Sequence, residues 1–462
     1  MTIQEMILKF DLCDLFYDNE YGLEKEGLRV LEKNDYVTMT DHPSSLGDPL
    51  SHPYIQTDYG EAQPELITPP FSTLFQSLDF LKLAASVLYD GMNEDEYLWP
   101  FSIPPHLPAD SAIRISESTS SEVKEYREYT GEKYGRSRQL MCGFHINCSL
   151  NSEFILALYE KQENIDNLKS FQNYLYMKLS QNFLRYQWIL IYLFGATPLA
   201  GQDFIEQNKM IENKAVQFPI RSIRNSSYGY FNGTDVKVRY DQLENYIFDI
   251  EENVQLKRLR EEREYYGDVR LKGGYGKQLR ELLQSGISYL EFRSMDLNPY
   301  SPTGLEKEQV QFIHIFLMYL LWIEETHAIE VVDEGMKRTL VTAEEHPHAE
   351  SQFAEDGIAF IEGMIDMLEQ IGKKEDLEAV KNYQKAFNDP HLTVAGRLLD
   401  DLAGPDSFIE LGHRWGQGYK KEFLSRPLNL SSFGEFPQEK EEEVFEMIRK
   451  GVSWEKLSLY FE

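Results

Sequence analysis

Three short acidic segments that lie far apart in the chain constrain its fold more than any other feature. They are residues 22–26 (GLEKE), 57–65 (TDYGEAQPE) and 289–293 (YLEFR). Alternate side chains of a β-strand project from one face, so Glu24 and Glu26 are expected to point together. By the same rule Glu291 shares a face with Arg293. Because the first and last segments are more than two hundred residues apart, the pattern predicts a sheet that interweaves distant parts of the chain.

The crowding of carboxylates in these segments also predicts what the sheet binds. Like charges a few ångströms apart repel strongly, so a folded protein tolerates such a group only where positive charge lies between its members. Carboxylate oxygens without a Cys or His cluster suit Mg²⁺, and Mg²⁺ held by carboxylates usually also contacts nucleotide phosphates. The sequence therefore predicts an enzyme that uses ATP and Mg²⁺.

The overall charge excludes two classes of partner. The chain has 462 residues, with 46 Lys and Arg against 77 Asp and Glu, and a formal net charge of −31. A surface of this sign repels nucleic acid and anionic lipid, so neither is an expected partner. ATP is repelled as well, so its site needs metal ions and local Arg or Lys. The apolar content of 42% is sufficient for a large folded core.

The three cysteines and the N-terminal residues indicate a compartment. Cys13, Cys142 and Cys148 are too few and too irregularly spaced for a disulfide framework or a thiolate zinc site, so buried or half-buried thiols are expected. The first residues are acidic and lack a cleavage pattern, so no signal peptide is expected. The apolar run 312–323 is too short to span a bilayer and predicts a buried helix. Together these features predict a cytoplasmic protein.

Hydrophobic periodicity predicts a mixed α+β fold. Strands are expected at residues 22–30, 64–68, 143–150 and 287–294. Helices are expected at residues 73–89, 171–194, 307–330, 354–371 and 375–387. His145, Asn147 and Ser149 share one face of their strand, opposite apolar residues, which is typical of an antiparallel sheet whose polar face lines a cavity. Without a repeat or a flexible linker, residues 1–462 are expected to form one interwoven catalytic domain, of which 305–462 is mainly helical.

Several longer motifs carry a resemblance to a known family. They are YGLEKEGLRV, HPYIQTDYGEAQPELITPPF, YLWPFSIPP, GFHINCSL, YLFGATP, RSIRNSSYGY and YLEFRSMDLNPYSP. In this order they resemble bacterial glutamate–cysteine ligase (γ-glutamylcysteine synthetase), and most of all the ligase half of the bifunctional glutathione synthetases. The resemblance extends from about residue 21 to about residue 399. The fused enzymes continue into an ATP-grasp domain, whereas this sequence ends at Glu462, so a stand-alone first-step enzyme without that domain is expected.

This resemblance implies a fold and a reaction. The fold is glutamine-synthetase-like, with an antiparallel sheet that curls into a funnel and helices packed outside it. The reaction joins the γ-carboxylate of L-glutamate to the amine of L-cysteine through γ-glutamyl phosphate, with ATP and with Mg²⁺ or Mn²⁺. Its product, γ-glutamylcysteine, is the first intermediate of glutathione biosynthesis. Phosphoryl transfer depends on charge neutralisation and positioning, which metal ions held by clustered carboxylates and an arginine can supply.

The same resemblance assigns roles to individual residues. The implied metal ligands are Glu24, Glu26, Asp58, Glu65, Glu96, His145 and Glu291. Glu26 and Glu291 are implied to be catalytic together with Arg293, which would lie against the transferred phosphate. The implied substrate-binding residues are Tyr59, Tyr126, Arg127, Thr130, Gln139, Arg224, Tyr230 and Tyr266. Arg270 and Lys272, in a basic glycine-rich stretch, are the candidate nucleotide-binding residues.

Two residues depart from the family pattern. Many relatives carry Phe where this chain has Tyr59, and often Leu where it has Thr130. Both changes add a hydroxyl to the implied wall of the cysteine pocket, and a buried hydroxyl without a partner costs about 1–3 kcal/mol. We therefore expect cysteine to remain the preferred amine, with looser discrimination against serine.

Simpler interpretations exist for each of these features. A Glu-Lys-Glu strand is usually a solvated edge, His145 alone is more often a hydrogen-bonded core histidine, and the tyrosines could be ordinary packing residues. His346 and His348 suggest a metal, but a capped polar loop is the favoured interpretation. Three other function classes also stay open: a related γ-glutamyl carboxylate–amine ligase with a different amine, an inactive homologue, and a metal-dependent hydrolase that works without ATP.

Overall fold

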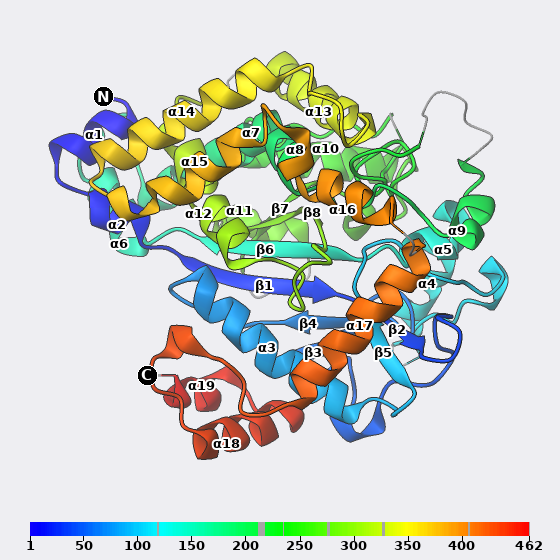
Figure 1. The fold of residues 1–462 in the computed structure, drawn as a ribbon. Coiled ribbons are helices and arrows are strands. Elements are labelled where there is room, and N and C mark those ends of the chain that lie inside the picture. Colours follow the sequence, from blue (N-terminus) through cyan, green and yellow to red (C-terminus); the bar gives the residue numbers. More distant parts are fainter. Residues whose placement is uncertain are drawn as a thin grey trace.

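Two antiparallel sheets form the centre of the protein (Figure 1), which a computed structural model describes over residues 1–117, 120–210, 218–233, 235–274, 278–325, 329–404 and 407–461. The strands are β1 (Glu20–Glu26), β2 (Leu28–Leu31), β3 (Ile55–Thr57), β4 (Pro64–Ile67), β5 (Glu96–Trp99), β6 (Gly143–Ser149), β7 (Val269–Lys272) and β8 (Tyr289–Asp296). Six of them form an open antiparallel sheet in the order β3–β4–β1–β6–β8–β7, and β2 pairs with β5 in a second sheet. Strands remote in sequence are therefore neighbours, as predicted.

The strand expected at residues 22–30 is divided between the two sheets at Gly27. β1 ends at Glu26 in the larger sheet, and β2 begins at Leu28 in the smaller one. Arg29 of β2 forms a buried ion pair with Glu96 of β5, which favours this second partner. The other three expected strands are found as β4, β6 and β8, within two residues of their expected bounds.

Helices surround the two sheets. The first set comprises α1 (Ile3–Lys9), α2 (Cys13–Tyr17), α3 (Leu74–Gly91), α4 (Ser121–Tyr134), α5 (Arg136–Gln139), α6 (Ser152–Tyr159), α7 (Leu168–Tyr186), α8 (Trp188–Phe194), α9 (Gln202–Gln207), α10 (Leu243–Gln255) and α11 (Leu282–Ser285). The second set comprises α12 (Lys307–Trp322), α13 (Ile329–Glu344), α14 (Ala354–Gln370), α15 (Leu377–Lys385), α16 (Val394–Leu402), α17 (Phe408–Leu424), α18 (Gln438–Arg449) and α19 (Trp454–Leu457). From Lys307 onward the described residues contain helices and connecting segments but no strand.

Two of the expected helices are divided. The helix expected at residues 171–194 is found as α7 and α8, which meet at Gln187. The amide of Gln187 donates to Oδ2 of Asp268 at 2.7 Å, a tertiary contact that sequence periodicity does not reveal. The helix expected at 307–330 ends at Trp322, and residues 326–328 of that expectation lie outside the described residues.

Apolar side chains fix the orientation of the larger sheet. Leu23, Ile146, Leu290 and Phe292 are buried, with α3 packed on β1 and β4, and α7 and α8 packed on β8. The rings of Phe183 in α7 and Phe292 in β8 lie 4.4 Å apart. In Figure 1 most helices, α7, α8, α12 and α14 among them, lie above β6, while α3 and α17 are drawn across the lower strands and α18 lies at the bottom of the view. Because one face is apolar, the alternate side chains of the same strands are polar and lie on the opposite face.

The cysteines and the apolar run behave as the sequence predicted. Cys142 and Cys148 are buried and Cys13 is half-buried, all three as free thiols. The run 312–323 lies mostly within α12, whose side chains are largely buried. No helix in the described part of the chain is both long enough and apolar enough to cross a membrane.

Candidate active site

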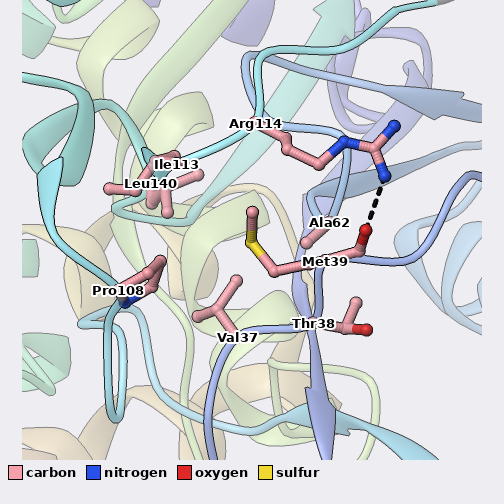
Figure 2. A pocket seen from close by; sticks show the side chains of 8 residues that line it. All are labelled: Val37, Thr38, Met39, Ala62, Pro108, Ile113, Arg114 and Leu140. Carbon is pink, nitrogen blue, oxygen red and sulfur yellow. Dashed lines mark hydrogen bonds between the residues drawn. The ribbon is translucent and has the colours of Figure 1, made fainter. Parts of the chain in front are cut away.

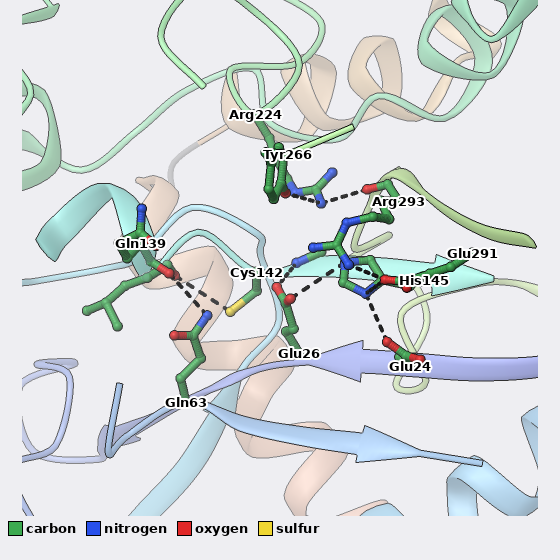
Figure 3. A network of polar contacts seen from close by, with 12 residues as sticks. Glu24, Glu26, Gln63, Gln139, Cys142, His145, Arg224, Tyr266, Glu291 and Arg293 are labelled. Carbon is green, nitrogen blue, oxygen red and sulfur yellow. Dashed lines mark hydrogen bonds and ion pairs between the residues drawn. The ribbon is translucent and has the colours of Figure 1, made fainter. Parts of the chain in front are cut away.

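Acidic side chains from adjacent strands meet around one histidine on the polar face of the larger sheet (Figure 3). The register places Glu24 of β1 opposite His145 of β6. The Nδ1 atom of this imidazole is 3.2 Å from Oε2 of Glu24 and 3.7 Å from Oε1 of Glu291, and its Nε2 atom is 3.6 Å from Oε1 of Glu26. The alternation seen in the sequence thus brings these four side chains together.

Glu65 of β4 belongs to the same set. It pairs with Glu26 in the strand register, and one ligand atom from each of Glu24, Glu65 and His145 lies within 4.8 Å of the other two. Burial, followed by the charges of Glu24 and Asp58, raises the pKa of Glu65 well above its ordinary value. A divalent cation would relieve this repulsion. We call Glu24, Glu26, Glu65, His145 and Glu291 the acidic group.

Basic residues from β7 and β8 neutralise one side of the acidic group. Glu291 forms ion pairs with Arg293 and with Lys272, whose Nζ lies 2.6 Å from Oε2 of Glu291. Arg270 is the register partner of Glu291. Burial raises the pKa of Glu291, but these three basic residues outweigh it and hold that pKa well below its ordinary value. Residues 275–277 of the glycine-rich stretch after Lys272 lie outside the described residues.

Several buried polar atoms of this face have no hydrogen-bond partner within the described chain. They are Nε2 of His145, Oδ1 of Asn147 and Nε of Arg293. A buried donor or acceptor left unpaired costs about 1–3 kcal/mol. Such atoms indicate that a bound ion, water or substrate supplies the missing contacts.

Arg224 connects the acidic group to the residues implied to bind substrate. Its Nη2 donates to the carbonyl oxygen of Arg293 at 2.7 Å and lies 3.5 Å from the hydroxyl of Tyr266. The guanidinium packs where Gly143 has no side chain, because a Cβ there would lie 2.2 Å from Nη2 of Arg224. The Gly143 N–H donates to Oε2 of Glu26 at 2.5 Å. The first residue of β6 therefore lets a cation approach the carboxylates closely.

The residues implied to surround the amine substrate include a pair of tyrosines and an amide. The rings of Tyr230 and Tyr266 meet edge to face, 4.4 Å apart, and the Arg293 guanidinium lies 5.1 Å from the Tyr266 ring centre. Gln139 accepts a hydrogen bond from Gln63 on its backbone oxygen at 3.3 Å. Its buried Nε2 has no partner among the described residues and is free to bind a ligand.

Helix α4 supplies two further candidates. Nη2 of Arg127 donates to the Thr57 carbonyl oxygen at 3.1 Å, whereas its buried Nη1 has no hydrogen bond to any residue that the structure describes. The ring of Tyr126 is covered by the guanidinium of Arg263, 4.1 Å from the ring centre. The unpaired nitrogen makes Arg127 a candidate for binding a substrate carboxylate.

The two hydroxyls that depart from the family pattern have different surroundings. The Tyr59 hydroxyl is buried without a partner in the described chain. It faces Gly131 of α4, where a Cβ would lie 2.2 Å from it. The Thr130 hydroxyl instead donates to the Arg127 carbonyl oxygen at 3.1 Å. The Tyr59 hydroxyl is therefore unsatisfied within the described chain, whereas the preceding helical turn accepts the hydrogen bond of the Thr130 hydroxyl.

Glu96 lies apart from the acidic group. It belongs to β5 of the smaller sheet, where Oε2 is 3.0 Å from Nη1 of Arg29. The hydroxyls of Thr38 and Thr40 donate to Oε1 at 2.7 and 2.6 Å. The implied metal ligand is thus corrected to a buried partner of Arg29, because both of its oxygens are already engaged by protein donors.

Two polar residues next to this site had no role assigned from the sequence. Nδ2 of Asn147 donates to Oε1 of Glu24 at 2.9 Å, and the period-two alternation of β6 was the signal that could have identified it. Asp296, at the end of β8, accepts a hydrogen bond from the hydroxyl of Ser222 at 2.8 Å and so fixes the segment that carries Arg224. No local pattern indicates Asp296, since its partners are remote in the sequence.

Two cavities lie away from the acidic group. The smaller, of about 10 Å³, is lined by Val37, Thr38, Met39, Ala62, Pro108, Ile113, Arg114 and Leu140 (Figure 2). It has room for about one water molecule and is too small for a substrate. The larger, of about 350 Å³, is lined by residues of α2, α3 and α12, including Tyr17 and His314. Neither cavity, over the described ranges, is lined by a member of the acidic group.

Carboxylates, a histidine and basic residues gathered on one face of a sheet are groups that can hold a polyvalent anion together with cations. Comparison with protein families shows which family the chain belongs to. The family model described as glutamate-cysteine ligase matches residues 6–258 and 252–343. The chain belongs to the glutamate–cysteine ligase family.

Two bacterial relatives show how much of a longer protein this chain matches. It is 38% identical over 458 residues to the glutathione biosynthesis bifunctional protein GshAB of Pasteurella multocida, covering 99% of this chain and 60% of that protein. It is 37% identical over 462 residues to the protein of the same name from Enterococcus faecalis, with 99% and 60% covered. The chain thus spans about three fifths of the length of these curated relatives.

Solved structures share the fold. The crystal structure of a bifunctional glutathione synthetase from Pasteurella multocida superposes with a TM-score of 0.90 at 37% identity, over 97% of this chain and 58% of that one. Glutamate–cysteine ligase from Francisella tularensis, solved in complex with AMP, superposes with a TM-score of 0.79 at 20% identity, over 96% and 97% of the two chains. The second likeness shows that helices around an open antiparallel sheet persist at low sequence identity.

Proposed function

We propose that the protein is an ATP-dependent ligase that joins the γ-carboxylate of L-glutamate to the amine of L-cysteine and releases γ-glutamylcysteine. The observation that carries the proposal is the contact, on one face of the sheet, between the acidic group and the basic residues Lys272 and Arg293. Family membership supports it. So does the 38% identity, over 99% of this chain, to a protein named for glutathione biosynthesis. The product would be the first intermediate of that pathway.

The donors of the acidic group fit Mg²⁺, with Mn²⁺ as a second possibility because a histidine is among them. A bound cation would lower the raised pKa of Glu65 and would supply a partner to Nε2 of His145, which makes no hydrogen bond within the described chain. Cations held by these side chains would supply charge neutralisation for the phosphate oxygens of ATP, which favours phosphoryl transfer. Asp58 remains a proposed ligand, and Glu96 is no longer included.

Three basic residues are proposed to hold the phosphates. Arg270 and Lys272 of β7 would contact the triphosphate, and Arg293 of β8 the phosphoryl group in transfer. A planar guanidinium can bind two phosphate oxygens at once, and the buried Nε of Arg293 has no protein partner within the described residues. The AMP complex of the ligase from Francisella tularensis, which has the same fold, supports an adenine nucleotide here.

The proposed reaction has two displacements. A γ-carboxylate oxygen of glutamate attacks the γ-phosphorus of ATP, the bond to ADP breaks, and γ-glutamyl phosphate forms. The cysteine nitrogen then attacks the acyl carbon, phosphate leaves with the oxygen that came from glutamate, and the nitrogen loses a proton. The residues of this face contribute by positioning the reactants and by holding charge where it develops.

The substrate carboxylates are proposed to bind to buried nitrogens that lack a protein partner. Such nitrogens are Nη1 of Arg127 and Nε2 of Gln139, among the residues described. Tyr126, Tyr230 and Tyr266, with Arg224, would surround the amine substrate. A water or a polar atom of the amine would satisfy the Tyr59 hydroxyl. This hydroxyl favours looser discrimination between cysteine and serine, and it keeps open a related ligase that uses a different amine.

Isotope transfer tests the proposed intermediate. With glutamate labelled with ¹⁸O in its γ-carboxylate, one labelled oxygen should appear in the phosphate released. Arg293→Lys should slow turnover sharply, because an ammonium group cannot reproduce the planar contact with two oxygens. Unlabelled phosphate would rule out γ-glutamyl phosphate.

A panel of amines, with glutamate, ATP and Mg²⁺, tests the substrate. ADP release and product mass should show γ-glutamylcysteine as the preferred product. Turnover of another amine but not of cysteine would favour the alternative ligase, and metal-dependent hydrolytic turnover that needs no ATP would favour a hydrolase.

We also propose that residues 1–462 act as one catalytic unit and that the polar face curls into a glutamine-synthetase-like funnel. Strands from both ends of the range 20–296 interleave in one sheet, which supports a single unit. One cooperative unfolding transition, seen by both fluorescence and circular dichroism, is the expected behaviour.

A further inference from the structure

A second group of metal-ligating side chains lies outside the acidic group, on the helical part of the protein. His348 lies in the loop after α13, His391 in the short helix Pro390–Leu392, and Asp400 in α16. The two imidazole rings are stacked, with centres 3.9 Å apart. One ligand atom of each of the three residues lies within 4.8 Å of the other two.

Both imidazoles present a nitrogen to the same carboxylate. Nδ1 of His391 is 2.8 Å from Oδ2 of Asp400, and Nε2 of His348 is 3.2 Å from Oδ1. Two imidazole nitrogens and a carboxylate are a common set of three protein ligands around Zn²⁺, with water in the remaining position. The separations are close to those of ligands around one ion, and a bound ion would replace the contact between Nε2 of His348 and the carbonyl oxygen of Gly396, 3.1 Å away.

A buried arginine holds the segments that carry the two histidines. Arg221 donates to the carbonyl oxygen of Pro347 at 3.1 Å and to that of Ala349 at 2.5 Å, on the two sides of the first histidine. It also reaches the hydroxyl of Thr393, 3.5 Å away and two residues after the second histidine. Arg221 is fully buried. Ligands on segments fixed in this way lose little conformational entropy when an ion binds.

We propose that His348, His391 and Asp400 form a binding site for a divalent transition metal ion of the zinc class, separate from the acidic group. Imidazole nitrogen favours Zn²⁺, Ni²⁺ and Cu²⁺, whereas Mg²⁺ prefers an all-oxygen set. The three side chains are 26%, 50% and 47% exposed, so an ion enters directly from solvent. Bound there, it joins the loop after α13 to α16 and stabilises the folded state by mass action.

Zinc binding by the full chain tests the proposal. After treatment with EDTA and dialysis, the protein competes for Zn²⁺ with a chromophoric chelator in the presence of excess Mg²⁺. His391→Ala and Asp400→Asn are each expected to lose one bound equivalent, or to weaken it at least about tenfold. Zn²⁺ should also raise the melting temperature of the parent protein, but not that of His391→Ala.

His413→Ala is a matched control. It removes a histidine that is also partly exposed and paired with one carboxylate, since its Nδ1 lies 2.6 Å from Oδ1 of Asp35. This variant should keep the zinc equivalent and the rise in melting temperature. ATP-dependent turnover with Mg²⁺ should be unchanged in His391→Ala, which confirms that the fold and the acidic group are intact. Equal zinc affinity and equal thermal shifts in the parent and in His391→Ala would overturn the proposal, as would a parent protein with no zinc equivalent beyond the acidic group.

Discussion

Each carboxylate of the acidic group has an ionisation state that depends on which charges lie beside it. Burial opposes the charge of Glu291, yet its basic neighbours hold the pKa of that carboxyl well below its ordinary value. Burial and neighbouring carboxylates raise the pKa of Glu65 instead. Two glutamates on one face of the same sheet therefore have pKa values shifted in opposite directions, because their neighbours differ. Glu291 is neutralised by the protein, and Glu65 is the carboxylate most in need of a cation.

Removing one negative charge tests the catalytic role at this scale. Glu26→Gln and Glu291→Gln preserve shape and should each lower kcat at least about a hundredfold, comparable to the loss of one electrostatic stabiliser of the transition state. Steady-state ADP release measures the effect. Glu20→Gln, at an exposed position of the same strand as Glu26, is the control and should be near normal. Near-normal turnover in a folded variant of Glu26 or Glu291 removes that residue from the proposed machinery.

His314 gives the protein a pH-dependent term in its stability. Its Nδ1 lies 2.7 Å from the hydroxyl of Tyr21. Burial, with a smaller contribution from Lys373, lowers the pKa of His314 to about 4, against 6.5 for an ordinary histidine. The folded protein keeps this imidazole neutral while the unfolded chain takes up a proton. The contribution is therefore fully present above about pH 6.5 and is lost as the pH falls towards 4.

The size of this effect is measurable by chemical denaturation. At about 1.4 kcal/mol per pKa unit, and with a side chain that is only half-buried, we expect a loss of roughly 2 kcal/mol between pH 7 and pH 4. His314→Asn, whose amide can still form a hydrogen bond with the Tyr21 hydroxyl, should flatten the dependence of the unfolding free energy on pH. An unchanged slope in His314→Asn would show that other groups carry the dependence.

At the scale of elements, strand β6 determines how closely the Arg224 guanidinium approaches the carboxylates of the acidic group. Its first residue, Gly143, donates its N–H to Glu26 and leaves the space that the Arg224 guanidinium fills. Strands β1 and β8 then place their carboxylates on either side of His145. The central strand thus contributes backbone and empty volume as well as side chains.

Filling that space should impair catalysis with little loss of fold. Gly143→Ala puts a methyl group where Nη2 of Arg224 lies, so the flexible guanidinium must move away from the site. We expect kcat/KM to fall about ten- to a hundredfold, with a melting temperature close to the parent value. Gly22→Ala on neighbouring β1 is the control, because its Cβ meets no atom closer than 3.5 Å. Equal activity of the two variants would contradict the role given to Arg224.

Periodicity predicted the strands that carry the site but not where they change partner. The alternation of Glu24 with Glu26 is a local property, so it could be interpreted without a structure. The first strand breaks at Gly27, after which β2 pairs with β5 and Arg29 forms an ion pair with Glu96, about seventy residues away. The same ion pair explains why Glu96 could not be separated from the metal ligands by sequence. The partners of Asp296 and Gln187 are equally remote.

At the scale of the whole molecule, a net charge of −31 sets the background against which the site works. Self-repulsion of this kind weakens the compact state. This repulsion is greatest where carboxylates lie close together. The acidic group is such a place, because its members come from several strands of the larger sheet. Cations bound there should therefore affect the stability of the entire fold.

Removal of divalent cations tests this coupling. EDTA should lower the melting temperature by on the order of a few °C relative to saturating Mg²⁺, because a ligand that binds only the folded state stabilises it. Glu65→Gln removes a carboxyl whose ionisation the fold disfavours, so it should raise the melting temperature in EDTA and reduce the gain from Mg²⁺. Glu20→Gln should behave as the parent. A lower melting temperature of Glu65→Gln in EDTA would show that the protein itself compensates the Glu65 charge.

The interleaved order of the strands has a consequence for synthesis on the ribosome. Glu24, Glu26 and Glu65 are translated well before Arg270, Lys272 and Arg293, since about 270 residues separate Glu24 from Arg293. At about 5–20 residues per second, the basic residues that neutralise these carboxylates are synthesised on the order of tens of seconds after them. During that interval β1 lacks both of its final neighbours for part of the time, so the nascent chain exposes an unpaired acidic strand. The polar face of the sheet is consequently assembled only after translation has passed β8.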